Sequence, residues 1–187
     1  MSAIQDSLAA TFASAKINPS RQREVSRVVD RIIAGRARYE GVEKTTGVPW
    51  WVIACIHNME ASLSFSKHLH NGDPLTARTR NVPANRPSVG KPPFSWEESA
   101  IDALRYDKLT DNSNWTIGVV LDLFERFNGL GYRKRKVASP YLWSFTNKYV
   151  KGKYTSDGIY SSTAVSQQVG IAAILIELAN RKAVSFD

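Results

Sequence analysis

Cysteine and histidine are scarce in this sequence, with one cysteine, Cys55, and three histidines in 187 residues. A single cysteine excludes an internal disulfide, and its apolar neighbours predict a buried thiol. Long hydrophobic runs are also missing, because the best of them, Gly170–Ala179, is short and contains Glu177. No transmembrane segment is therefore expected. The N-terminus lacks a basic leader followed by an apolar block, so we expect no secretory signal peptide and synthesis in the cytoplasm.

The composition is that of a soluble globular protein, with 43% hydrophobic and 22% charged residues. The length is typical of one domain. The net charge of +8 indicates a polyanionic partner. Nucleic acid, anionic lipid and bacterial cell wall all satisfy that condition, and charge alone does not choose among them.

Helical patterns dominate the first third of the chain. Ser2 is placed to cap a first helix, and Pro19 opens a second helix whose apolar residues recur at helical spacing. Gly47 ends the segment before it, and Pro49 suits the first turn of a third helix. This third helix is expected to run to about Glu60.

The pattern changes after Glu60. The stretch S-L-S-F-S alternates polar and apolar residues, and Asn71-Gly72 is a hairpin turn signal. Residues 64–80 are therefore predicted to form a small hairpin or irregular β element. Four prolines then predict a loop over residues 82–94.

Helical patterns return at Ser95, which has capping-box spacing to Glu98. Further helices are expected over about 114–127, from Ser139 to Trp143, and from about 162 to 182. The last of these is apolar nearly all round, which is typical of a central helix. The elements together predict a mainly α fold with a small β-hairpin after the helix that ends at Glu60.

Glu60 continues a largely apolar helix face, since steps of three and four residues lead back to Ile56 or His57 and then to Ile53. A carboxylate on such a face loses solvation, which raises its pKa. A glutamic acid that stays protonated near neutral pH can protonate the oxygen that leaves a glycosidic bond. The alternative is a helix-end carboxylate that points to water.

Inverting glycoside cleavage needs a second carboxylate about 6.5–9.5 Å from the acid, and a covalent mechanism needs one at about 5–5.5 Å. Asp73 is preferred over Asp102 and Asp107, because a hairpin that starts at the helix end can fold back toward Glu60. The alternative for Asp73 is turn chemistry, since N-G-D-P is a good turn sequence whatever the function.

A helix that ends in a glutamate, then a β excursion, then helices around a long apolar helix resembles the lysozyme superfamily, which includes goose-type lysozymes, lytic transglycosylases and phage endolysins. The segment I-H-N-M-E-A-S resembles the stretch around their catalytic glutamate. The likeness covers roughly Val48 to Tyr154. It implies a single lysozyme-like domain over 1–187, in which N-terminal helices of residues 1–46 pack on a catalytic core of residues 48–182.

The same resemblance implies roles for individual residues. Glu60 would be the general acid, and Asp73 would be the water-activating carboxylate, since goose-type lysozymes have an aspartate at a similar spacing. Phage-type lysozymes place a threonine shortly after their aspartate. D-P-L-T-A-R-T offers Thr79 at a similar offset, with Thr76 as a lesser choice.

A second block, F-N-G-L-G-Y, resembles segments that line the sugar cleft in lytic transglycosylases. Asn128 would face an N-acetyl group, and Tyr132 would stack on a sugar or hydrogen-bond to it. Tyr141 lies beside a proline-containing loop and is a further cleft candidate, while His57 is expected beside the site. Other aromatic residues offer sugar platforms or, alternatively, core packing: Trp50, Trp51, Trp96 and Trp143 as platforms, with core packing favoured for Trp51, Trp115 and Phe124.

A metal site is not expected, although His57, His68 and His70 invite the question. Zinc needs three or four convergent ligands, and no zinc-hydrolase motif is present. Cys55 is rejected as a nucleophile because His57, two positions away, points elsewhere on a helix. The basic run of residues 133–136 indicates a solvated surface or contact with anionic envelope polymers. No base-reading motif accompanies the charge, so nucleic acid is not the expected partner.

We therefore expect a bacteriolytic glycoside hydrolase, a lysozyme or muramidase that cleaves β-1,4 bonds between N-acetylmuramic acid and N-acetylglucosamine in peptidoglycan. It would need no cofactor and act as a monomer. The missing signal peptide fits an antimicrobial endolysin that reaches the cell wall after release, or an enzyme exported by another route. The alternatives are a lytic transglycosylase that uses Glu60 alone, and a non-catalytic module that binds cell wall or nucleic acid.

Overall fold

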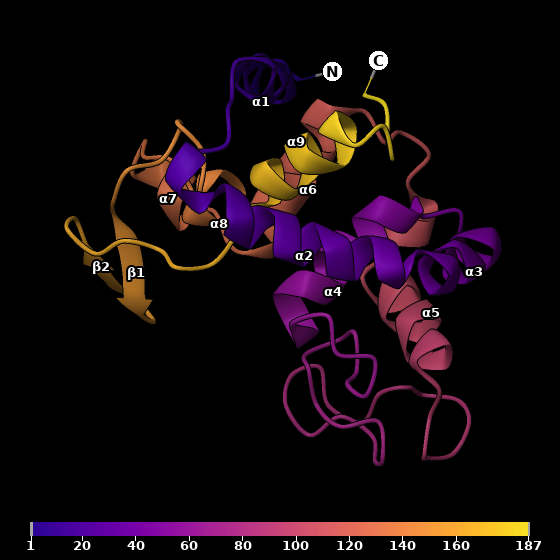
Figure 1. Ribbon diagram of the computed structural model, residues 1–187. Helices are drawn as coiled ribbons and strands as arrows, with labels where there is room; N and C mark the ends of the chain where they lie inside the picture. The colour runs from indigo at the N-terminus through magenta and orange to yellow at the C-terminus, as the bar shows by residue number, and fades with distance from the viewer. Residues whose placement is uncertain (1, 187) are drawn as a thin grey trace. The chain divides into compact units, whose positions relative to one another are not determined.

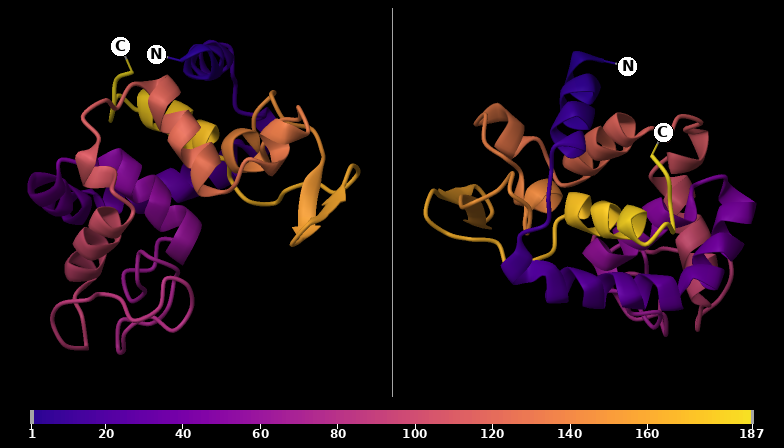
Figure 2. Two further views of the ribbon diagram at one scale, coloured as in Figure 1. Left: turned by 180° about the vertical axis from the view of Figure 1, so that it is seen from behind. Right: turned by 45° about the horizontal axis from the view of Figure 1, so that its top comes forward.

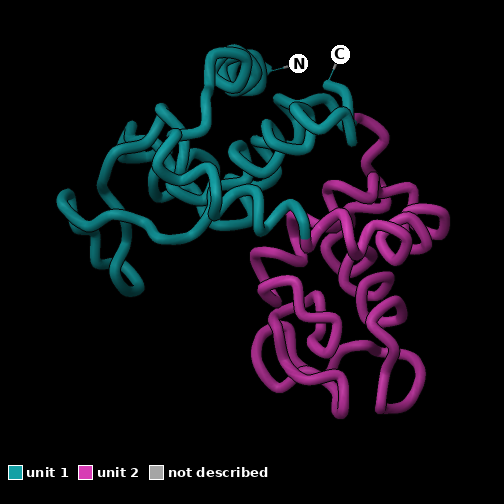
Figure 3. Tube along the Cα trace, in the orientation of Figure 1, with its two compact units in different colours: residues 1–30, 115–187 teal, residues 31–114 magenta. Residues whose placement is uncertain are grey.

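The computed structural model describes residues 2–186, and its contacts divide the chain into two compact units (Figure 3). Unit 1 contains residues 1–30 and 115–187, so both ends of the chain belong to it, and unit 2 contains residues 31–114. The division does not fall near residues 46–48, where the N-terminal helices were expected to meet the core. The expectation of one domain over the whole chain stays a prediction.

The fold is mainly α with one small antiparallel hairpin, as the sequence predicted (Figure 1). Helix α2 begins in unit 1 and ends in unit 2. The helices and strands of unit 1 are α1 (Ala3–Ala13), η1 (Pro19–Arg21), the start of α2 (Gln22–Ala34), α6 (Ile117–Phe127), α7 (Gly131–Lys134), α8 (Pro140–Trp143), β1 (Lys153–Ser156), β2 (Ile159–Ser161) and α9 (Ile171–Asn180). Those of unit 2 are the end of α2, α3 (Arg36–Thr46), α4 (Trp50–Ala61), α5 (Trp96–Tyr106) and η2 (Leu109–Asp111).

The core of unit 1 forms where α6 packs against α1, α8 and α9, and both views of Figure 2 show α6 and α9 side by side. Helix α9 buries nearly all of its side chains, which confirms that it is central. Its predicted start near residue 162 was wrong. The helix begins after Gly170, which is its N-cap residue. A side chain does not fit at this position, because a Cβ would lie 2.6 Å from the carbonyl oxygen of Leu142. Among residues 2–186, every helix falls short of the length and apolarity that a membrane crossing requires.

Local helix signals in the sequence are confirmed. Ser2 caps α1 and forms a capping box with Gln5. Ser95 and Glu98 form the predicted box at the start of α5. In each box the serine oxygen accepts a backbone N–H of the first turn, and the partner side chain accepts the N–H of the cap residue.

The hairpin lies at residues 153–161 and not at residues 64–80, where the sequence predicted a small hairpin or an irregular β element. The 64–80 segment has one isolated bridge, between Lys67 and Pro74, and is otherwise made of turns. Side chains satisfy backbone groups there, since Asn71 donates to the carbonyl oxygen of Asn81. Such bonds offer the backbone an alternative to a β ladder.

The core of unit 2 forms where α3 packs against α4 and α5. An aromatic cluster occupies this core, with the rings of Tyr39, Phe65 and Trp96 arranged around His57 at centroid distances of 4.7 to 5.7 Å. Cys55 of α4 is fully buried, which confirms the predicted buried thiol. Burial also raises the pKa of that thiol well above its usual range.

Candidate functional site

Glu60 lies in the last turn of α4, a helix whose side chains are otherwise largely buried. Its own side chain is half-buried. Burial raises the pKa of the Glu60 carboxyl to about 7, and the nearby Asp107 carboxyl contributes to the same shift. The main cause is the loss of solvation that the apolar helix face predicted. At neutral pH a substantial fraction of Glu60 therefore carries a proton that it can donate.

The turn that carries Asp73 lies against the end of α4. Gly72, with a φ of 77°, approaches so closely that a Cβ there would lie 2.5 Å from the carbonyl oxygen of Glu60. The sequence predicted that the chain folds back toward Glu60 after the helix, and the backbone does so. Only glycine suits such a position, because it combines a left-handed backbone with no room for a side chain.

The Asp73 carboxylate itself is held by three hydrogen bonds. The backbone N–H groups of Arg80 and Asn81 donate to Oδ2, and the Asn81 side chain donates to Oδ1 at 2.7 Å. The hydrogen bond from the Asn81 backbone is the main reason that the pKa of Asp73 lies below its ordinary value. Asp73 therefore stays ionised and can orient a water molecule, but it is a weak base.

Asp107 is the carboxyl group whose charge acts on Glu60. It follows the last residue of α5, and burial raises its pKa while Arg86 opposes that shift. The sequence analysis preferred Asp73 to Asp107 because a hairpin that starts at the helix end can fold back toward Glu60. In the fold of unit 2, however, it is the charge of Asp107 that contributes to the raised pKa of Glu60.

Thr79 is 2% exposed, and its hydroxyl group fastens the loop of residues 79–86. The hydroxyl donates to the carbonyl oxygen of Pro83 and accepts the backbone N–H of Arg86 at 2.9 Å. Its hydrogen is therefore already used within the loop. Placement of a catalytic water by Thr79 stays a prediction and would use the remaining lone pair of its oxygen.

His57 was expected among the substrate-binding residues, and the structure corrects this. Its side chain is fully buried in the aromatic cluster, and Nδ1 is hydrogen-bonded to the Tyr39 hydroxyl at 2.8 Å. Burial lowers the pKa of His57 to about 4. A neutral imidazole without exposed surface supports the helix that carries Glu60 and does not touch a ligand.

The other two histidines anchor the 62–95 loop to α5 through a buried polar network. His68 and Ser99 are hydrogen-bonded at 2.8 Å, and His70 bonds to Asp102 at 2.8 Å. Arg86 completes the network with two bonds to the same carboxylate. These partners account for the two histidines without a metal. Among residues 2–186, no group of three or more His, Cys, Asp or Glu side chains is placed to hold a metal ion.

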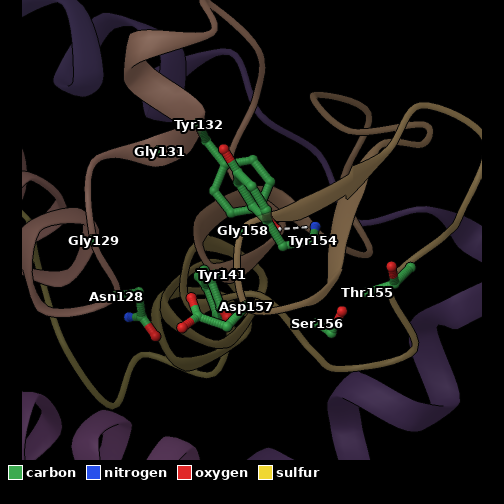
Figure 4. A pocket seen from close by; sticks show the side chains of 10 residues that line it. All are labelled: Asn128, Gly129, Gly131, Tyr132, Tyr141, Tyr154, Thr155, Ser156, Asp157 and Gly158. Carbon is green, nitrogen blue, oxygen red and sulfur yellow. Dashed lines mark hydrogen bonds between the residues drawn. The ribbon is translucent and has the colours of Figure 1, made fainter.

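Unit 1 contains a cavity of about 470 Å³ that brings together three predicted site residues, Asn128, Tyr132 and Tyr141 (Figure 4). The segment after α6 supplies the first two, and α8 supplies the third. The volume lies in the range typical of small-molecule sites. The remaining lining residues are Gly129, Gly131, Tyr154, Thr155, Ser156, Asp157 and Gly158.

The rings in this cavity hold one another in place. Tyr132 meets Tyr141 and Tyr154 edge to face at centroid distances of 5.9 and 5.1 Å. Its hydroxyl accepts the backbone N–H of Tyr154, which Figure 4 draws as a dashed line. Edge-to-face pairs are a favourable arrangement for aromatic rings. Tyr132 is thereby 3% exposed, so Tyr141 and Tyr154 offer more ring surface than Tyr132 does.

The β-hairpin forms one wall of the cavity, and sequence reasoning missed it. Its turn contributes Asp157, an exposed carboxylate, and Gly158, which has a φ of 72°. The signal was present, because Asp-Gly between β-forming residues is a strong hairpin indicator. Of the four tryptophans considered as sugar platforms, three are in the core, with Trp50, Trp96 and Trp143 at most 6% exposed, whereas Trp51 is only partly buried.

Comparison with protein-family models, curated proteins and solved structures finds no match for this chain. The residues and their geometry are therefore the basis of the functional proposal.

Proposed function

We propose that this protein is a peptidoglycan-cleaving glycoside hydrolase of the lysozyme type, with Glu60 as its general acid. The observation that carries the proposal is the carboxyl group of Glu60, whose pKa burial raises to about 7 in the last turn of a largely buried helix. A carboxylic acid in partly apolar surroundings is the group that protonates the leaving oxygen in glycoside cleavage. The resemblance of I-H-N-M-E-A-S to the lysozyme superfamily supports the same role.

In the hydrolase mechanism, Glu60 gives its proton to the oxygen between N-acetylmuramic acid and N-acetylglucosamine. Asp73 orients or deprotonates the attacking water, and Thr79 helps to place it. The tyrosine-lined cavity of unit 1 suits sugar binding, because Tyr141 offers a ring face and Asn128 an amide that pairs with an N-acetyl group. This chemistry needs no cofactor.

The direct test is Glu60→Gln, which keeps the shape of the side chain and removes the acid. Loss of one general acid costs about 10²- to 10⁴-fold in rate, so clearing of a peptidoglycan suspension should fall by that factor. Glu43→Gln in α3 is the matched control and should retain full activity. Undiminished clearing by Glu60→Gln would refute the proposal. A parent protein that binds cell wall but never clears it would be the non-catalytic module.

A lytic transglycosylase is the second candidate, and one observation favours it. The Asp73 carboxylate already accepts three hydrogen bonds and has a lowered pKa, so it is poorly suited to remove a proton from water. In a transglycosylase Glu60 first gives its proton to the leaving glycosidic oxygen. It then acts as a base and takes the proton of a hydroxyl group of the same sugar, whose oxygen bonds to the anomeric carbon in place of the leaving group. No second carboxylate is required.

The proposed partner is peptidoglycan, with additional contact to anionic envelope polymers through the basic surface. The net charge of +8 supports this. We further propose that the protein acts as a monomer on the cell wall after release, in the manner of an endolysin.

A further inference from the structure

A second cavity in unit 1 has no part in the proposed cleavage. It lies between α1 and the segment of residues 133–148 and has a volume of about 620 Å³. Part of its lining is apolar, with Ile4 and Leu8 from α1 and with Val137 and Trp143 from the later segment. Ile4 and Val137 are 42% and 38% exposed, so apolar surface is open to solvent at this cavity. Open apolar surface in a cavity is a typical mark of a ligand site.

Helix α1 explains why this surface stays open. The helix buries none of its side chains, although its sequence AIQDSLAATFA is mostly apolar or small. It is held against α6 by a close backbone approach, since a Cβ on Gly118 would lie 2.4 Å from the carbonyl oxygen of Gln5. The face that carries Ile4 and Leu8 is therefore left to line the cavity.

The lining also contains cationic side chains. Arg133, Lys136 and Lys148 line the cavity together with one acid, Glu125. Arg133 pairs with Glu125 and also with Asp122, which pairs in turn with Arg126, so these two cations and two acids balance one another. Within residues 2–186, Lys136 and Lys148 take part in no salt bridge, so two positive charges are left uncompensated beside an apolar wall.

Ser139 adds a polar group that lacks a partner. It lines the cavity and is 2% exposed, and its Oγ makes no hydrogen bond. Buried hydroxyl groups are normally hydrogen-bonded. A rotation of this side chain toward the cavity would break no existing bond, so a ligand oxygen can satisfy it at little cost.

We propose that this cavity binds a single-chain anionic amphiphile, an alkyl chain that ends in a carboxylate. The chain lies against Ile4, Leu8 and Trp143, and the carboxylate lies between Lys136 and Lys148 within reach of Ser139. A neutral apolar ligand would leave the two lysines unused. A polyanion such as nucleic acid would leave the apolar wall unused.

Isothermal titration with decanoate tests the ligand class on the full chain, with decanol and decyltrimethylammonium as matched probes. Decanoate should bind saturably at one site, at least fivefold more tightly than decanol, and the cationic probe should bind most weakly. Added salt should weaken only decanoate binding. Equal affinity for all three probes, or the absence of saturation, would overturn the proposal.

Variants place the site within the chain. Lys136→Ala combined with Lys148→Ala should bring the decanoate affinity down to that of decanol. Lys134→Ala, in the same basic run but outside the lining, should change it less than twofold. An equal loss in Lys134→Ala would mean that binding follows surface charge and not this cavity.

A test variant and a matched control examine the apolar part of the lining. Ile4→Ser should weaken decanoate and decanol alike, by about fivefold, because it removes apolar surface from the cavity. Ile33→Ser, at a comparably exposed position of α2, should leave both affinities unchanged. No change in Ile4→Ser would contradict the proposed position of the chain. These experiments measure binding alone, so their outcome is independent of wall cleavage.

Discussion

The surroundings of Glu60 in unit 2 and the tyrosine-lined cavity in unit 1 differ in the polar groups that they present. In unit 2, the half-buried carboxyl group of Glu60 lies in partly apolar surroundings and holds its proton to about pH 7, and the charge of Asp107 adds to this shift. In unit 1, the cavity around Tyr132 and Tyr141 is lined by neutral hydroxyl, amide and ring groups, with one exposed carboxylate, Asp157. The first arrangement prepares a proton for transfer, and the second offers hydrogen bonds and ring faces.

This difference separates the expected roles. Changes around Glu60 should alter the rate of bond cleavage, because a proton donor matters most in the transition state. Changes in the tyrosine cavity should alter substrate affinity, because ring stacking acts in the ground state as well. A kinetic analysis that measures kcat and KM separately can therefore distinguish the two roles.

The largest effect after loss of Glu60 itself is expected for Asp73→Asn. If Asp73 activates water, the change should lower kcat by about 10²-fold. Asp111→Asn, on the exposed η2 turn of the same unit, is the control and should behave like the parent. Near-full activity of Asp73→Asn would exclude the hydrolase mechanism, and anhydro-sugar products would then establish the transglycosylase.

Two glycines with similar backbones give a matched pair across the units. Gly72→Ala should lower the free energy of unfolding by roughly 2 to 5 kcal/mol, because strain at positive φ adds to a clash with the Glu60 carbonyl oxygen. Gly158→Ala has a φ of 72° but nothing within 4 Å of the new Cβ, so it should cost about 1 kcal/mol. Thermal melts measure both. Equal losses of unfolding free energy in the two variants would show that the turn at Gly72 is not in close contact with α4.

The pH dependence of stability tests the raised pKa of Glu60. The unfolded chain loses this proton near pH 4.5 and the folded chain near pH 7, so Glu60 makes the folded state less stable as pH rises through that window. Glu60→Gln should therefore gain stability over the parent between those values, on the order of 1 to 2 kcal/mol, because the group is partly solvated. Urea melts at pH 4 and pH 8 measure the gain. A constant difference would contradict the assigned pKa.

The smallest effect is expected in the tyrosine cavity. Tyr141→Ala should raise KM by about three- to tenfold and leave kcat nearly unchanged, because it removes a ring surface. Tyr106→Ala, which removes a half-exposed ring from α5 in unit 2, is the control and should leave KM unchanged. A loss in kcat alone for Tyr141→Ala would move the cavity from a binding role to a catalytic one.

Local features of this fold could be predicted from sequence because their causes are local. Ser2 and Ser95 cap helices through partners three residues away. The apolar run in α9 predicts burial whatever surrounds it. The start of α9 could not be predicted, since Gly170 is placed by a close approach to Leu142, which is distant in sequence.

The two turn signals in the sequence also show that contacts between distant residues limit what can be predicted. Asn71-Gly72 and Asp157-Gly158 both indicate a hairpin, yet only the second pair turns between strands. The side chains of Asn71 and Asp73 bond to residues 80–82, and Gly72 packs on α4, so contacts beyond the turn decide its form.

The candidate site was predictable to a similar degree. The apolar face of one helix was enough to indicate a raised pKa for Glu60, because desolvation by burial is the main cause of the shift. The influence of Asp107 was not, since it follows a different helix. His57 was misjudged because helical spacing does not reveal that Phe65 and Trp96 close over its ring.

Mass spectrometry of purified peptidoglycan, digested with the parent protein and with Glu60→Gln, is the most direct test that Glu60 is the proton donor. We expect disaccharide fragments cut at N-acetylmuramic acid, with reducing ends from the hydrolase or anhydro ends from the transglycosylase, in the parent digest alone. Intact peptidoglycan in the parent digest, or the same fragments from Glu60→Gln, would contradict the assignment of Glu60 as the proton donor.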